Sequence, residues 1–128
     1  MLMNRNDITL LMDSIQRAFE KKDLSAALAY YHNDISFTSP AFPAPIMGKE
    51  ALETAFRKHF DTPQVTRMSF KDIRIQDLGD SAFVVLCRVE GVQTVLLSGR
   101  RFNGYLSRVF VSQDDRPLII HEHFSLLT

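Results

Sequence analysis

The order of two hydrophobic patterns limits the possible folds of this chain more than any other feature. Before Thr62-Pro63, apolar residues recur at helical spacing; after it, β-branched and aromatic runs alternate with turn signals. Helices first and strands last predict an α+β domain with an antiparallel sheet. The length of 128 residues fits one domain that spans residues 1–128.

Three helices are predicted in the first half of the chain. Residues 7–22 carry one apolar stripe, with Asn6 or Asp7 as the N-cap. Asp23 caps a second, shorter helix that runs to residue 31. The third helix spans residues 49–60 and follows a segment in which closely spaced prolines exclude both helix and sheet.

Strands are predicted in the second half, after a short one over residues 35–38. They span residues 65–76, 81–90, 92–101, 105–112 and 117–126. Glycine-containing pairs such as Glu90-Gly91 and Asn103-Gly104 are interpreted as turns between them.

Residues 82–87 are apolar in both alternating sets, so neither face of that strand looks solvated. The helices can cover one face only, and we therefore expect a homodimer through the outer sheet face. The alternative is a monomer whose outer face is merely rich in aromatic residues.

Composition narrows the possible partners. Fifteen basic and fifteen acidic side chains cancel, which argues against nucleic acid. No apolar run is long enough to cross a bilayer, and the polar start does not resemble a secretory signal. The single cysteine, Cys87, is expected to be a buried, inert side chain in a cytoplasmic protein.

Four segments carry a resemblance to a known family: KDLSAAL (22–28), YHNDISF (31–37), GKEAL (48–52) and PLIIHEHFS (117–125). In this order they resemble the nuclear transport factor 2-like superfamily, which includes ketosteroid isomerase, the SnoaL polyketide cyclases and the association domain of calmodulin-dependent kinase II. The resemblance implies a cystatin-like cone, three helices on a curved antiparallel sheet, enclosing a pocket for a small apolar molecule.

The ketosteroid isomerase catalytic set is not preserved. By the resemblance, its catalytic aspartate falls on Ser39, its tyrosine donor on Ile15 and its aspartic-acid donor on or near Ser107. These three positions are expected to border the pocket. A serine hydroxyl cannot abstract a carbon-bound proton without an adjacent base, so steroid isomerisation by that mechanism is not expected.

The last strand offers another candidate. The register taken from the resemblance turns Ile120, Glu122 and Phe124 toward the pocket and turns His121 and His123 away. SnoaL-like cyclases have a catalytic carboxylate at about the Glu122 position. Desolvation favours a neutral carboxyl group, which suits acid–base chemistry near neutral pH. The alternative is a structural carboxylate paired with an arginine, Arg101 or Arg108.

Two further side chains are expected to contact a ligand: Tyr31, through its hydroxyl, and Phe56, on the apolar stripe of the third helix. His121 and His123 lack an obvious third ligand, so neither a metal nor another cofactor is expected. Two functions stay open. One is a proton-transfer isomerase, cyclase or dehydratase acting on a small apolar carbonyl compound. The other is a non-catalytic ligand-binding or association module.

Overall fold

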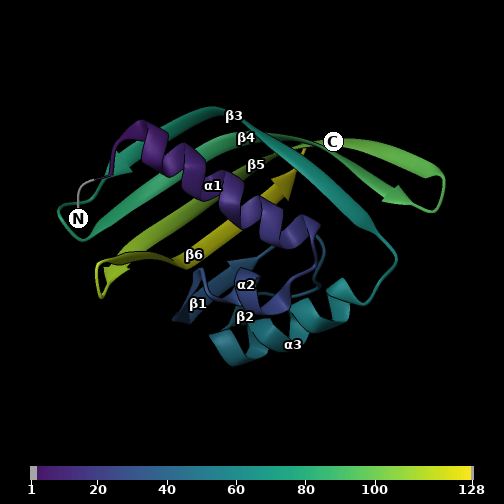
Figure 1. Ribbon diagram of the computed structural model, residues 1–128, viewed down its shortest axis with the longest axis horizontal. Helices are drawn as coiled ribbons and strands as arrows, with labels where there is room; N and C mark the ends of the chain where they lie inside the picture. The colour runs from purple at the N-terminus through teal and green to yellow at the C-terminus, as the bar shows by residue number, and fades with distance from the viewer. Residues whose placement is uncertain (1–2, 128) are drawn as a thin grey trace.

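The computed structural model describes residues 3–127. Three helices and six strands are formed in this range (Figure 1). The helices are α1 (Arg5–Glu20), α2 (Leu24–Leu28) and α3 (Lys49–Phe60). The strands are β1 (Tyr31–Thr38), β2 (Ile46–Met47), β3 (Val65–Asp77), β4 (Ala82–Val95), β5 (Ser98–Gln113) and β6 (Arg116–Leu126). The α+β class is confirmed.

The helices are where the sequence predicted them, with small shifts at their ends. The N-cap of α1 is Asn4, not Asn6 or Asp7. Its side chain accepts a hydrogen bond from the Asp7 amide, and the Asp7 carboxylate accepts one from the Asn4 amide. Asp7 is therefore the third residue of a capping box. Asp23 caps α2 as expected, but α2 ends at Leu28 and not at residue 31 as predicted; α3 has the predicted bounds.

The strands form one sheet in the order β2-β1-β6-β5-β4-β3. Neighbouring strands are antiparallel except β1 and β6, which run parallel. The expectation of a purely antiparallel sheet is therefore wrong at this pair. β1 is also longer than predicted because it begins at Tyr31, opposite Ile119, rather than at residue 35.

The expected turns at Gly91 and Gly104 do not exist. β4 and β5 instead form one long hairpin that turns at Leu96-Leu97 and projects at the right of Figure 1. Both glycines lie inside strands. Gly91 is paired with Phe102, whose ring occupies the space that a side chain at Gly91 would need. A glycine inside a strand can mark a close approach rather than a turn, and this is such a case.

Replacing Gly104 tests this interpretation. A β-carbon there would overlap the backbone oxygen of Ser125 and lie 2.8 Å from the Phe124 ring. We expect Gly104→Ala to lower the free energy of unfolding by about 1–3 kcal/mol, because strand backbone must move. Gly99→Ala is the matched control, since its nearest neighbour would be 3.6 Å away. Equal urea midpoints for the two variants would contradict the close-approach interpretation.

A bulge in β6 decides which side chains of that strand face inward. Val109 pairs with His121, but the next residue of β5, Phe110, pairs with Ile119. Ile120 is therefore the extra residue of a β-bulge. The inward positions are Ile119, which is fully buried, and Glu122.

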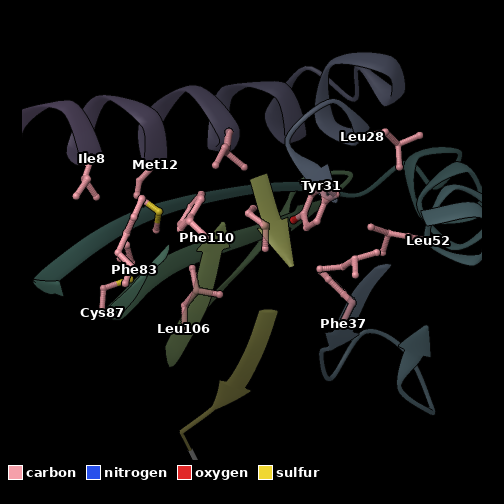
Figure 2. Close-up of a cluster of buried hydrophobic side chains, with 14 of the residues drawn as sticks. Ile8, Met12, Leu28, Tyr31, Phe37, Leu52, Phe83, Cys87, Leu106 and Phe110 are labelled. Atoms are coloured by element: carbon pink, nitrogen blue, oxygen red, sulfur yellow. The ribbon is translucent and has the colours of Figure 1, made fainter. Parts of the chain in front are cut away.

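The apolar core fills the space between α1 and the concave side of the sheet. Ile8 and Met12 of α1 lie over Phe83 and Phe110, whose rings stack with centroids 4.9 Å apart (Figure 2). Tyr31 connects this part of the core with the side chains of α2 and α3. No helix within residues 3–127 is both long and apolar enough to span a membrane.

Candidate functional site

A cavity of about 380 Å³ opens between the helices and the sheet. Its wall is largely aromatic. The aromatic rings that line it are Phe19, Phe37, Phe42, Phe56, Phe60, Phe102 and Phe124. Several of them meet edge to face, for example Phe37 and Phe56 with ring centroids 5.5 Å apart. Such a lining favours a flat, partly apolar ligand, which polar side chains of the wall would orient.

The principal polar group of the wall is a buried ion pair. Arg108 of β5 lies directly opposite Glu122 of β6 in the antiparallel register. Arg108 Nε donates to Glu122 Oε1 over 2.7 Å. The side chains are 2% and 7% exposed, so water screens the pair very little. Both residues line the cavity.

Tyr31 completes a three-residue cluster. Its hydroxyl donates to the same oxygen, Glu122 Oε1, over 2.8 Å. Burial, together with the neighbouring Glu122 carboxylate, raises the pKa of Tyr31 well above its usual value, so the hydroxyl keeps its proton. Burial is the largest single influence on the pKa of Arg108 and acts to lower it, but the interactions with Glu122 and the other neighbours together outweigh it, and the net shift is upward. The cluster is thus a charged pair supported by a neutral donor.

One atom of each ion-pair partner is left over. Arg108 Nη1 donates to the Met12 sulfur over 3.4 Å, but Nη2 has no acceptor among the described residues. Glu122 uses Oε1 twice, whereas Oε2 has no donor among residues 3–127. The pair therefore keeps a donor nitrogen and an acceptor oxygen that its own hydrogen bonds do not use.

Of the other polar side chains that line the cavity, Gln16 and His59 have distinctive surroundings. Gln16 of α1 is only 5% exposed, and its Oε1 is the one fully buried side-chain oxygen or nitrogen without a partner in the described part of the chain. His59 of α3 lies against the rings of Phe42 and Phe60. Burial and then the charge of Lys22 lower the pKa of His59, so its ring is neutral at neutral pH.

The structure places some of the predicted site residues on the cavity wall and others elsewhere. Glu122, Ser39, Phe56 and Phe124 line the same cavity. Tyr31 reaches the cavity wall through its bond to Glu122.

Ile15, Ile120 and Ser107 are not among the lining residues. Ile15 of α1 is fully buried in the apolar core of the domain. Ile120 is displaced by the bulge. Ser107 pairs with His123 on the outward side of β5 and β6. Adjacent residues of a strand face opposite sides of a sheet, so Ser107 points away from the cavity that Leu106 and Arg108 line. Arg108 takes the inward position.

Arg101 is exposed and belongs to no salt bridge among residues 3–127, so the paired-arginine alternative involves Arg108.

Gln16 was overlooked, although the sequence contains a signal for it. Ile8, Met12 and Gln16 follow one another at intervals of four, so Gln16 continues the buried stripe of α1. A polar side chain on such a stripe needs an explanation.

The two histidines of β6 lie outside this site. His121 faces β1, where its Nδ1 and the Ser36 hydroxyl are 2.7 Å apart, and His123 is exposed. In residues 3–127 no three His, Cys, Asp or Glu side chains are grouped as metal ligands would be. Cys87 is buried in the core, and this burial raises its thiol pKa to about 11.

A helix-covered, curved sheet with one aromatic pocket defines a protein of the nuclear transport factor 2-like superfamily. The family model of the SnoaL-like domain matches residues 8–128, and the chain belongs to this family. A search of curated protein sequences finds no significant match.

Solved structures confirm the fold at low sequence identity. The β subunit of benzoate 1,2-dioxygenase from Burkholderia mallei is 14% identical, with a TM-score of 0.86 over 99% of this chain and 93% of the other. The association domain of C. elegans CaMKII is 18% identical, with a TM-score of 0.79 over 94% of both chains. A candidate scytalone dehydratase from Novosphingobium aromaticivorans is 13% identical, with a TM-score of 0.83 over 94% and 82%. These proteins have different functions, so the fold alone does not define an activity.

Proposed function

We propose that the cavity binds a small, largely apolar carbonyl compound and that Glu122 moves a proton on it. The observation that carries the proposal is the buried Arg108–Glu122 pair, whose free donor and acceptor both belong to residues of an aromatic cavity wall. Isomerisation, cyclisation and dehydration of carbonyl compounds share one first step, the removal of a proton next to the carbonyl.

Glu122 is suited to be the base in this step. Tyr31 and Arg108 both hold Oε1, which fixes the carboxylate and leaves Oε2 to accept a proton. The carbonyl oxygen of the ligand would accept a hydrogen bond from Arg108 Nη2. Removal of the α-proton breaks a C–H bond, forms an O–H bond on Glu122 and leaves the electron pair on the enolate oxygen.

The charge balance of the site favours this transfer. Before the step, the positive charge of Arg108 faces the Glu122 carboxylate; afterwards it faces the enolate oxygen. One negative charge moves over a short distance beside the same guanidinium, so no new unpaired charge is created in a site shielded from water. The aromatic wall would exclude competing water from the enolate.

Deuterium exchange tests the proposal. Acetophenone, cyclohexanone and 2-tetralone would be incubated with the protein in D2O, and loss of the α-proton signals followed by 1H NMR. We expect exchange of at least one ketone to exceed the buffer rate. The comparison protein is Glu90→Gln, which changes an exposed carboxylate that pairs with Arg88 outside the cavity. Exchange at the buffer rate across the panel would favour a non-catalytic binding module.

A second role, self-association, is supported by the outer face of the sheet. Leu86 and Tyr105 are 43% and 53% exposed on the side away from the helices. Their neighbours on this face include Val84 and Val109, which are paired in the register. We infer that a second copy of the chain covers this face, as a homodimer. The single buried cysteine, Cys87, suits assembly in the reducing cytoplasm.

Light scattering after size exclusion tests the dimer. We expect the native chain to elute with twice its monomer mass and Leu86→Lys to elute as a monomer, because a lysine would be desolvated in the interface. Leu10→Lys is the control, since Leu10 is 62% exposed but lies on α1. A monomeric native chain at concentrations of about 100 μM would overturn the inference.

A further inference from the structure

We propose that Gln16 is a specificity-determining residue of the cavity, and that its side-chain oxygen accepts a hydrogen bond from a hydroxyl or N–H group of the ligand. This inference rests on the proposed function, because it adds a second recognition point to the same cavity. The ligand class that follows is a carbonyl compound with a hydrogen-bond donor at its far end.

The unpartnered oxygen of Gln16 is the first argument. A buried polar atom without a hydrogen bond is costly, and native proteins contain few of them. Oε1 of Gln16 is such an atom, and the residue lines the cavity. A ligand that supplies the missing donor would remove this cost, which a purely apolar ligand cannot do.

The orientation of the amide sets the chemistry of the ligand. Gln16 Nε2 points to Glu20 Oε1, one turn further along α1, at 3.5 Å. The reversed amide would place two acceptor oxygens against each other. The unsatisfied group of Gln16 is therefore an acceptor, so the ligand must supply a donor. The last torsion of glutamine is soft, which lets Oε1 turn toward a bound molecule at little cost.

The position of Gln16 sets the spacing of the two recognition points. Met12, whose sulfur contacts Arg108 Nη1, lies four residues earlier on the same stripe of α1. Four residues advance a helix by roughly 6 Å along its axis. The ligand would place its carbonyl at Arg108 and its donor about one helical turn away, with a flat body between the phenylalanine rings.

Matched ligand pairs test this inference. The probes are 4-hydroxyacetophenone against 4-methylacetophenone, and 6-hydroxy-2-tetralone against 6-methyl-2-tetralone, which exchange a donor for a methyl group of similar size. Dissociation constants would be measured by protein-observed NMR titration. We expect the native protein to prefer a hydroxylated probe by about tenfold. Gln16→Met should abolish this preference, whereas Gln76→Met, which changes an exposed glutamine of β3, should retain it.

The unfolding midpoint of the ligand-free variants provides a second readout. Gln16→Met should be at least as stable as the native chain, because it removes an unsatisfied polar group from a buried position. Binding without a preference for the hydroxyl, or a preference that Gln16→Met retains, would overturn the role of Gln16 but leave the cavity as a ligand site. A marked loss of stability in Gln16→Met would assign Gln16 a structural role instead. Failure of all four probes to bind would contradict the proposed function itself.

Discussion

Arg108→Met is expected to lower the free energy of unfolding by about 3–5 kcal/mol. The substitution keeps an unbranched side chain over the length of the arginine stem, but it leaves Glu122 buried without its cation. Tyr31 would remain as a donor to Oε1, and one neutral hydrogen bond does not replace a guanidinium. Urea denaturation measures the loss.

A second substitution separates the charge from the packing. In the double variant Arg108→Met with Glu122→Gln, no charge is left unpaired, so most of the lost stability should return. Arg88→Met is the matched control, because Arg88 forms exposed ion pairs with Asp72 and Glu90, and little change is expected. A double variant no more stable than Arg108→Met alone would show that packing, and not charge, holds this part of the core.

Glu122→Gln is expected to reduce the rate of α-proton exchange by about 10²–10⁴-fold. The amide keeps the shape of the carboxylate, and its oxygen can still accept from Tyr31 and Arg108. It cannot take a proton at neutral pH, so the loss should fall on turnover. The same NMR assay in D2O measures the effect for any ketone that the native protein exchanges.

Binding separates catalysis from structure in this variant. A catalytic Glu122 predicts that Glu122→Gln still binds the ketone, with a dissociation constant close to the native value, while exchange is lost. Unchanged exchange in a folded Glu122→Gln variant would remove Glu122 from the mechanism. Exchange lost together with binding and with cooperative unfolding would assign it the structural role of an ion-pair partner.

Much of the fold could be predicted because local patterns determine it. The apolar spacing over residues 49–60 and the capping aspartate at residue 23 are properties of a few neighbouring residues, and both predictions were confirmed. The chain order of helices and strands was enough to indicate the superfamily. These features require no knowledge of which strand lies beside which.

The errors within the sheet came from the pairing between strands. Gly91 and Gly104 have the composition of turns, but each lies where another strand brings an aromatic ring close to the backbone. The bulge at Ile120 arises from the pairing of β6 with β5, and the sequence around Ile120 does not indicate it.

These register errors affected the prediction of some residues of the candidate site and not of others. Glu122 lies beyond the bulge, where the inward parity taken from the resemblance holds, and it lines the cavity. Ser107 is not on the cavity wall, because the resemblance does not fix the register of β5 and adjacent residues of a strand lie on opposite faces. The cluster joins the consecutive strands β5 and β6, through Arg108 and Glu122, to Tyr31 of β1, which is far from them in sequence.

A crystal structure of the protein soaked with 4-hydroxyacetophenone tests whether the cavity holds a ligand between Arg108 and Gln16. We expect a molecule inside the phenylalanine-lined cavity, with its carbonyl oxygen in hydrogen-bond contact with the Arg108 guanidinium and its hydroxyl directed at Gln16. Density for the ligand elsewhere, or a cavity closed by side chains with Arg108 and Glu122 fully satisfied by each other, would contradict this expectation.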